Sequence, residues 1–216
     1  FVYIAESLNR IGENWTGSWD EEEGFFYDVL AMPDGRYIPL KVRSLVGLST
    51  LFAVFVLKKD LLEKVPEFHR RLKWFQRYRS DNGQYLVIED LKEHDDILLS
   101  LVPKDRLKRL MKPLLDENEF LSKGGIRSIS KVHQNGYSVN INGEDFGLDY
   151  QPGEGTSSLF GGNSNWRGPV WMPMNFLLVK ALKQYCDYYK DDCLVEFPTG
   201  SGHLMMLREV SDEISR

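Results

Sequence analysis

Residues 160–189 read FGGNSNWRGPVWMPMNFLLVKALKQYCDYY, a glycine-rich turn that runs into a long apolar segment. After Pro169 the apolar residues recur every three to four positions, and proline is favoured in the first turn of a helix. The segment therefore predicts a helix over 169–189. The turn and the helix start supply two aromatic rings, an amide and a guanidinium: Asn165, Trp166, Arg167 and Trp171. Because aromatic faces stack on sugar rings and polar groups bond sugar hydroxyls, this combination indicates a sugar-binding wall. The alternative is a tight loop whose tryptophans pack onto the core.

Helical periodicity continues on both sides of this stretch. It predicts helices over residues 1–13, 44–58, 66–79 and 103–116, with Ser44 as an N-cap, and a last helix over 200–214. Alternation and turn signals predict a hairpin over 24–41 with Pro33-Asp34-Gly35 as its turn, and short strands over 84–91, 138–141 and 147–150. Residues 124–162 show little helix but many Gly, Ser, Asn and aromatic residues, which indicates an ordered, functional loop. Helical hairpins with long inserted loops predict a mainly α fold of the α/α toroid type.

The composition is that of a globular protein, with 42% hydrophobic and 27% charged residues among 216. The formal net charge of −5 argues against nucleic acid or an anionic membrane as the main partner. No apolar run approaches the ~20 residues that span a bilayer. His69, His94, His133 and His203 share no ligand spacing, so we expect no metal and no cofactor. Nothing in the composition indicates an obligate protein partner.

The two cysteines, Cys186 and Cys193, are too few for a disulfide framework. Two unpaired thiols in a reducing compartment are expected instead, and with them a cytoplasmic location. The first residues, Phe1-Val2-Tyr3-Ile4, follow a helical pattern and lack the layout of a signal peptide. The chain also ends within a helical pattern, so we expect residues 1–216 to be a fragment of one domain, truncated at both ends.

Three acidic stretches could carry chemistry. Residues Asp20–Glu23 are four consecutive acids that cannot all be buried, and they indicate a largely solvated turn. Asp28 lies between aromatic and apolar residues, where it could orient Arg43 or a sugar hydroxyl, or form a structural ion pair. Glu196 lies in an apolar setting before a turn. Because burial raises the pKa of a carboxyl group, Glu196 is a candidate for general acid–base work, although a structural role is equally open.

Four segments occur in an order that resembles glycoside hydrolase family 63, in particular its bacterial and fungal branch, akin to processing α-glucosidase and mannosylglycerate hydrolase. They are residues 19–28 (WDEEEGFFYD), 41–48 (KVRSLVGL), 163–173 (NSNWRGPVWMP) and 196–202 (EFPTGSG). The third segment is the most specific. The first is shared with neighbouring toroid glycosidases such as trehalases.

The resemblance implies an (α/α)6 toroid of six helical hairpins, of which residues 1–216 form about half as a fragment of one catalytic domain. It also implies inverting hydrolysis of α-glycosidic bonds in oligosaccharides or small glycosides. Inversion uses a carboxylic acid and a carboxylate about 6.5–9.5 Å apart, with a water between base and sugar. The general acid is expected upstream of residue 1, because Trp19-Asp20 has the family's dipeptide without its context. Glu196 is the candidate base, and a further glutamate beyond Arg216 is the alternative. The expected sugar-binding residues are Asn165, Trp166, Arg167, Trp171, Asp28 and Arg43.

Two other functions fit parts of the sequence. A non-catalytic helical interaction or scaffold module would expose an apolar stripe along its helices. Another toroid sugar enzyme, an epimerase or a lyase, would use a His or Tyr base, for example His133 pointing into the cleft. The glycosidase hypothesis instead predicts that Trp166, Arg167, Trp171 and Glu196 converge on one concavity.

Overall fold

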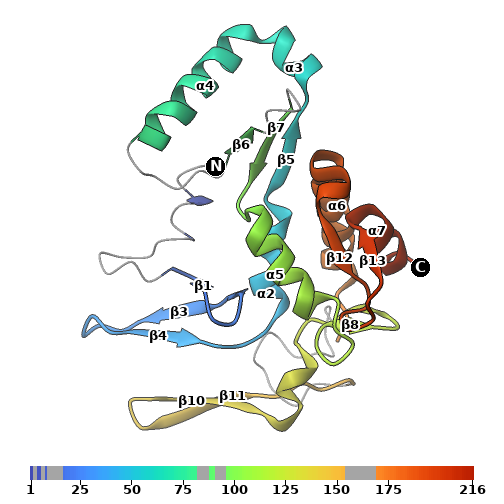
Figure 1. Ribbon diagram of the computed structural model, residues 1–216. Coiled ribbons are helices and arrows are strands. Elements are labelled where there is room, and N and C mark those ends of the chain that lie inside the picture. The colour runs from blue at the N-terminus through green and yellow to red at the C-terminus, as the bar shows by residue number, and fades with distance from the viewer. Residues whose placement is uncertain (2–3, 6–7, 9–16, 82–87, 91–95, 154–168) are drawn as a thin grey trace.

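The computed structural model describes residues 1, 4–5, 8, 17–81, 88–90, 96–153 and 169–216. Helices and short antiparallel strand pairs alternate along these residues (Figure 1). The fold is therefore mainly helical with short hairpins, as the sequence predicts. Closure of six helical hairpins into a toroid, and the assignment of the chain to one catalytic domain, stay predictions.

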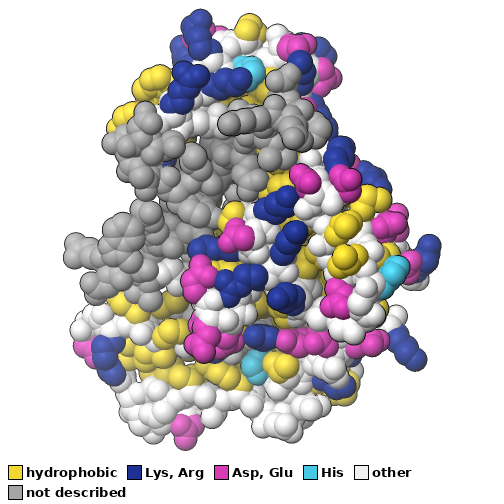
Figure 2. Space-filling model, viewed as in Figure 1, with side chains coloured by type: hydrophobic (Ala, Val, Ile, Leu, Met, Phe, Trp, Pro, Cys, Tyr) yellow, Lys and Arg dark blue, Asp and Glu magenta, His cyan; other side chains and the backbone are white. Residues whose placement is uncertain are grey.

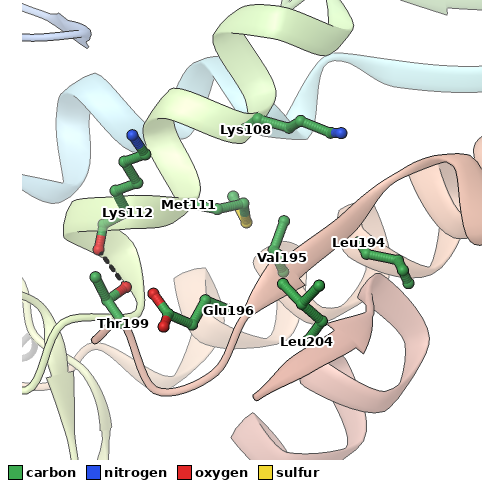
Figure 3. A pocket seen from close by; sticks show the side chains of 8 residues that line it. All are labelled: Lys108, Met111, Lys112, Leu194, Val195, Glu196, Thr199 and Leu204. Atoms are coloured by element: carbon green, nitrogen blue, oxygen red, sulfur yellow. Dashed lines mark hydrogen bonds between the residues drawn. The ribbon is translucent and has the colours of Figure 1, made fainter. Parts of the chain in front are cut away.

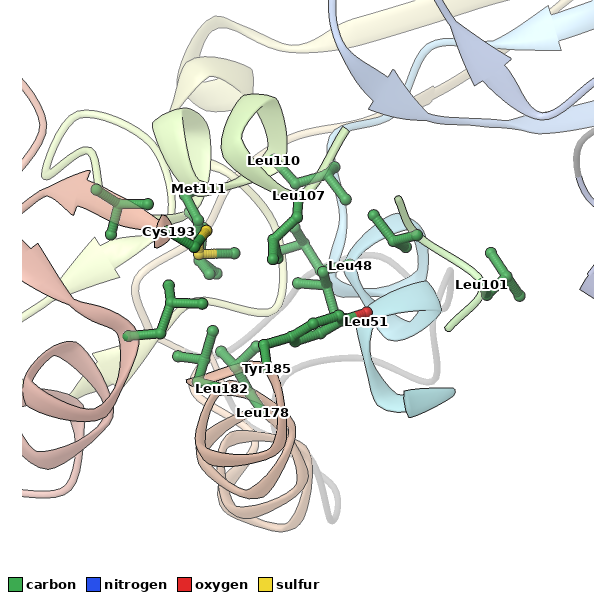
Figure 4. Close-up of a cluster of buried hydrophobic side chains, with 14 of the residues drawn as sticks. Leu48, Leu51, Leu101, Leu107, Leu110, Met111, Leu178, Leu182, Tyr185 and Cys193 are labelled. Atoms are coloured by element: carbon green, nitrogen blue, oxygen red, sulfur yellow. The ribbon is translucent and has the colours of Figure 1, made fainter. Parts of the chain in front are cut away.

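The core lies where α5 (Lys104–Leu114), α6 (Met172–Tyr189) and the segment formed by α2 (Leu45–Leu48) and η1 (Ser49–Phe52) come together (Figure 4). Apolar residues of α5 and α6 recur three and four positions apart, so each helix turns one apolar face inward. Six of these side chains have no exposed surface: Leu107, Leu110, Leu114, Leu178, Leu182 and Tyr185. The helix α7 (Leu207–Ile214) packs along α6 and covers it from the other side. The helices predicted over 103–116 and 169–189 are thus confirmed to within a few residues.

The helix predicted over 44–58 is wrong beyond Phe52. Ser44 does cap α2, and its hydroxyl accepts the Val46 N–H at 3.3 Å. After η1 the chain extends into β5 (Val54–Leu57), which pairs with β7 (Ile97–Ser100), and β7 pairs in turn with β6 (Ile88–Asp90). The β-branched and aromatic residues of β5 favour a strand once a partner strand is present. That partner comes from a distant part of the chain, so local periodicity does not reveal it.

The hairpin predicted over 24–41 forms as β3 (Asp28–Ala31) and β4 (Tyr37–Leu40), with Gly35 in its turn at a φ of 84°. Gly24 belongs instead to a preceding hairpin of β1 (Trp19–Asp20) and β2 (Phe25–Phe26). The predicted strands over 138–141 and 147–150 form the hairpin of β10 (Tyr137–Ile141) and β11 (Glu144–Leu148). The second strand starts earlier than predicted because Asn142 and Gly143, both at positive φ, close the turn in two residues.

The remaining short elements lie between α5 and the chain end. They are β8 (Leu121–Ser122), β9 (Gly125–Ile126), η2 (Lys131–Asn135), η4 (Lys190–Asp192), β12 (Leu194–Glu196) and β13 (Leu204–Met206). The helix predicted over 200–214 begins only at Leu207, after the β12–β13 hairpin. Gly200 and Gly202 have φ values of 87° and 75° in the turn of that hairpin, and these are incompatible with an α-helix.

The helices α3 (Lys59–Lys64) and α4 (Pro66–Asp81) form an arm that extends beyond the β5–β7–β6 sheet (Figure 1). Helix α4 confirms the prediction over 66–79, with Pro66 in its first turn. Basic side chains gather over this arm at the top of Figure 2, and Arg70 and Arg71 are exposed there. Trp74 and Tyr78 are also exposed, and their rings stack with centroids 5.6 Å apart.

Among the helices of the described residues, none combines the length and the apolar character needed to cross a bilayer. Cys186 and Cys193 are both buried free thiols, as predicted. Of the helix predicted over 1–13, Ile4, Ala5 and Leu8 are described and helical. Ala5 is buried and Leu8 packs against the core.

We expect Leu182→Ala to lower the free energy of unfolding by about 2–5 kcal/mol, because it removes a fully buried side chain from the contact of α6 with the core. The matched control is Leu177→Ala on the same helix, where the side chain is 44% exposed and the change should stay within about 0.5 kcal/mol. Both substitutions change helix propensity equally. Denaturant unfolding of the two variants measures the difference, and equal destabilisation would contradict this placement of the core.

Candidate functional site

Two adjoining pockets follow the C-terminal half of α5, and together we call them the α5 groove. The first has a volume of about 190 Å³ and lies between α5 and the β12–β13 hairpin (Figure 3). It is lined by Lys108, Met111, Lys112, Leu194, Val195, Glu196, Thr199 and Leu204. The second has a volume of about 370 Å³ and is lined by Glu22, Glu23, Arg43, Arg109, Lys112, Pro113, Asp116, Glu119 and Thr199. Lys112 and Thr199 line both pockets, so the pockets adjoin there, on either side of the contact between these two residues.

Helix α5 forms the shared wall of the groove. Much of its surface is buried in the core, and Lys108, Met111 and Lys112 line the first pocket. In Figure 3 Met111 points toward the β12–β13 hairpin, and the backbone carbonyl of Lys112 faces Thr199. The β12–β13 turn is tied to the C-terminal end of α5 by Thr199, whose hydroxyl donates to the Lys112 carbonyl at 2.8 Å. The Thr199 N–H also donates to the Leu115 carbonyl at 3.0 Å. These bonds satisfy carbonyls that a helix end leaves free, and they fix the distance between the two walls.

Glu196 lies at the end of β12 and lines the first pocket. It is partly exposed, and its carboxylate accepts the backbone N–H groups of Gly200, at 2.8 Å, and Gly202. These two hydrogen bonds lower the pKa of Glu196, because they stabilise the charged form. The sequence predicted the opposite shift, from an apolar setting, and that premise is wrong. The catalytic role of Glu196 stays a prediction, and the hydrogen bonds also give the carboxylate a structural part in closing the turn.

Arg43 reaches the second pocket from the segment between β4 and α2. Its Nη1 is paired with Glu119, its Nε donates to the Tyr27 hydroxyl at 3.1 Å, and its Nη2 lies 3.4 Å from Glu23. Burial alone lowers the pKa of Arg43, but the hydrogen bonds to Glu119 and Tyr27 outweigh it and raise the pKa overall. The guanidinium is therefore charged and held in one orientation, and the side chain, 20% exposed, lines the second pocket.

The acidic turn between β1 and β2 is less solvated than the sequence predicted. Glu21 and Glu22 are exposed, but Asp20 and Glu23 are half-buried and pair with Lys41, at 2.9 and 2.8 Å. Hydrogen bonds from the Glu23 N–H and from Lys41 lower the pKa of Asp20. Burial raises the pKa of Glu23, but hydrogen bonds from Lys41 and Tyr27 exceed this effect and lower it. Lys41, directly after β4, thus anchors both carboxylates, and this anchoring places Glu23 in the pocket wall.

His133 fixes the backbone of Arg43. Its Nε2 accepts the Arg43 N–H at 2.8 Å, and the Ser130 N–H donates to the Arg43 carbonyl at 2.9 Å. Burial, and then the charge of Arg43, lower the pKa of His133, so the ring is neutral with its proton on Nδ1. The ring is buried and packs edge-on against Tyr137. His133 therefore serves as a support of Arg43 and lies outside the lining of both groove pockets.

The structure brings two of the predicted site residues, Arg43 and Glu196, to adjoining pockets. Asp28 is exposed on β3, and the ion-pair partners of Arg43 are Glu119 and Glu23 in its place. Trp171 caps the N-terminus of α6 and packs partly buried against the core, away from the lining of the groove. Asn165, Trp166 and Arg167 lie outside the described residues, so their convergence with Glu196 stays a prediction.

Several groove residues were not singled out from the sequence: Lys108, Arg109, Lys112, Asp116 and Glu119. They lie on α5 or just after it. The sequence signal that could have identified them is the amphipathic pattern of this helix, in which polar residues alternate with the buried apolar ones. Within the described ranges, no group of three or more His, Cys, Asp or Glu side chains is arranged to hold a metal ion.

We expect the stability of the protein to fall as the pH drops below the ordinary histidine pKa of about 6.5, partly because of His133. Its pKa is lowered in the folded state, so the unfolded chain binds the proton first and unfolding becomes easier as the pH falls through this range. His133→Gln keeps an acceptor for the Arg43 N–H and cannot titrate. It should therefore reduce the loss of melting temperature between pH 7.5 and 5.5.

His203→Gln is the matched control, since His203 is exposed on the β12–β13 turn and should leave the pH dependence unchanged. Thermal unfolding at the two pH values measures both variants. An unchanged loss in His133→Gln would contradict the role given to the buried neutral ring.

Comparison with known proteins gives three findings. Residues 96–194 match the family described as the glycosyl hydrolase family 63 C-terminal domain. The chain is 41% identical over 228 residues to an uncharacterized protein of Saccharomyces cerevisiae, covering 99% of this chain and 21% of that protein. It is 36% identical over 90 residues to a probable mannosyl-oligosaccharide glucosidase of Schizosaccharomyces pombe, covering 41% of this chain and 8% of that protein. The chain thus spans about a fifth of the first relative's length and less than a tenth of the second's. The match of residues 96–194 and the similarity to the glucosidase confirm the resemblance to glycoside hydrolase family 63 that the sequence motifs indicate.

Proposed function

We propose that the protein carrying this chain hydrolyses α-glycosidic bonds in oligosaccharides or small glycosides with inversion, and that the α5 groove is part of its sugar-binding cleft. The observation that carries the proposal is that the two pockets adjoin along α5, which brings Arg43 and Glu196 to neighbouring hollows in a chain that matches a glycosidase family over residues 96–194. Arginine and lysine donors stand beside carboxylate acceptors there, as the recognition of sugar hydroxyls requires.

Each predicted residue has a chemical task in this proposal. Glu196 is the candidate general base: its lowered pKa keeps the carboxylate ionised at neutral pH, so that it can take a proton from the attacking water. The general acid is expected from a segment upstream of residue 1. Trp166 would supply an aromatic face, and Asn165 and Arg167 further polar contacts to the sugar. Trp171 and Asp28 lie outside the lining of the α5 groove, so they would contact the sugar in another part of the cleft. We also keep the cytoplasmic location as part of the proposal.

The two alternative functions receive less support. The match of residues 96–194 to a glycosidase family does not favour a non-catalytic scaffold. Among the described residues, exposed apolar side chains do lie on α4 and on α6, namely Phe68, Trp74, Tyr78, Met172, Phe176 and Leu177, and these are what a scaffold could use. An epimerase or lyase would place a His or Tyr base in the cleft, whereas His133 is buried and its Nε2 already accepts a hydrogen bond.

The experiment that tests the function is hydrolysis of a panel of α-linked glucosides, mannosides and short oligosaccharides by the full-length protein. We expect turnover of at least one α-glycoside, with the sugar released first as its β-anomer. Proton NMR during the first minutes distinguishes this product from the α-anomer before mutarotation mixes them. Release of the α-anomer would exclude inversion. If none of the glycosides is hydrolysed, the scaffold hypothesis becomes the favoured one.

We expect Glu196→Gln to lower kcat/KM by about 10²–10⁴, the usual contribution of a general base. The matched control is Asp34→Asn, because Asp34 is also a turn carboxylate that accepts a backbone N–H, in the β3–β4 hairpin and outside the lining of the groove. That variant should keep wild-type activity.

The pH profile of wild-type kcat/KM gives a second readout of Glu196. Because the pKa of Glu196 is lowered, the acid limb should lie below about pH 4.3, the ordinary value for glutamate. An acid limb near pH 6, or activity within a few-fold of wild type in Glu196→Gln, would assign Glu196 to the turn and place the base on another carboxylate.

A further inference from the structure

The guanidinium of Arg43 retains hydrogen-bonding capacity toward the second pocket. An arginine carries five N–H donors. Within the described residues three are engaged, by Glu119, Tyr27 and Glu23, and 20% of the side chain is exposed beside the pocket. Two N–H groups on the terminal nitrogens therefore remain for a ligand. Their fixed, planar arrangement suits two neighbouring acceptor oxygens.

Glu119 determines where this donor pair points. One carboxylate oxygen pairs with Arg43 Nη1, and the other accepts the Ser130 hydroxyl at 3.1 Å. The side chain is only 13% exposed, so it has little freedom to turn away. The Glu119 carbonyl also accepts the Lys131 N–H at 3.1 Å and Arg127 Nη1 at 3.0 Å. Glu119 is thus held by the same segment that holds the Arg43 backbone through Ser130 and His133.

The charges around the pocket work against an anionic ligand. Four carboxylates and three cationic side chains line it: Glu22, Glu23, Asp116 and Glu119, with Arg43, Arg109 and Lys112. Arg109 is paired with Glu21 at 2.6 Å, and Arg43 with Glu119, so two of the cations are already balanced by an acid. An anionic sugar would meet more carboxylate than free positive charge, whereas hydroxyl groups can donate to the carboxylates and accept from Arg43.

Building on the proposed function, we infer that the second pocket selects an uncharged sugar, and that Glu119 is a positioning residue for this selection. Arg43 binds two neighbouring hydroxyls of the ring with its two remaining N–H groups. Glu119 fixes the guanidinium in that orientation and cancels its charge, so that a uronic acid gains nothing from binding there. Loss of the Glu119 charge leaves Arg43 with Glu23 alone, 3.4 Å away and already paired with Lys41, so the guanidinium is less fully balanced and favours a carboxylate on the sugar.

The test compares the best neutral α-glycoside of the panel with its uronic acid counterpart in the full-length protein. Wild type should prefer the neutral substrate at least a hundredfold in kcat/KM. In the near-isosteric Glu119→Gln variant we expect this preference to fall at least tenfold, with a raised KM for the neutral substrate. In the double variant Glu119→Gln/Arg43→Met the preference should return toward the wild-type value, because the cation that Glu119 balanced is gone. Asp187→Asn is the matched control, since it breaks an arginine–carboxylate pair with Arg208 outside the groove lining and should change neither value.

A binding measurement separates this inference from the proposed function. NMR titration of the same variants with glucose and with glucuronate gives the ratio of dissociation constants without catalysis. If wild type hydrolyses no glycoside but still binds glucose in preference to glucuronate through Glu119, the proposed function fails and the selection stands. If Glu119→Gln leaves both ratios unchanged while its melting temperature equals that of wild type, or if wild type takes the uronate equally well, the inference is overturned. If Glu119→Gln has a lower melting temperature than wild type, the Arg43→Met variant becomes the test. The inference requires that Arg43→Met weaken binding of the neutral sugar at least tenfold, and a smaller effect overturns it.

Discussion

The burial of one face of α5 is the constraint on which the other parts of this structure depend. Leu107, Leu110 and Leu114 lie in the core with no exposed surface, so the helix cannot rotate without exposing them. Its opposite side must then present lysines and arginines to the surface at fixed positions. Arg106 and Arg109 lie over the Trp19 ring at 4.7 and 5.2 Å and hold the β1–β2 hairpin, while the Lys112 carbonyl holds the β12–β13 turn. The groove is thus a consequence of core packing, since both of its walls are fastened to one buried helix.

Long periodic segments and turn chemistry could be predicted from the sequence, because their causes are local. The helices over 66–79 and 169–189 and the turn at Pro33-Asp34-Gly35 all follow from residues within one or two turns of each other. The errors have the opposite origin. Val54–Leu57 form a strand because they pair with β7. The residues directly before Leu207 are not helical because they form β13, which pairs with β12. Both depend on contacts that local periodicity does not contain.

The same distinction explains what was found of the site. Arg43 and Glu196 could be chosen from residue type and motif, but their partners could not. Glu119 lies 76 residues from Arg43 in the chain, and His133 lies 90 residues away. The sequence interpretation of Glu23 rested on the neighbouring acids, whereas its environment is set by Lys41, 18 residues later in the chain. The direction of the pKa shift of Glu196 likewise depends on how the following turn folds back, which the apolar flanking residues do not determine.

The network around Arg43 is better explained by geometry than by stability. Removing charges from water costs energy that a partly buried ion pair only just recovers, so such pairs add little to the net stability of a fold. Arg43 nevertheless takes three acceptors on two other segments, and its backbone is held on both sides by Ser130 and His133. A guanidinium used for stability alone could be replaced by an apolar side chain of similar volume. A guanidinium that must keep two N–H groups directed at a pocket cannot be replaced in this way. The acids around it then keep its orientation fixed and balance its charge.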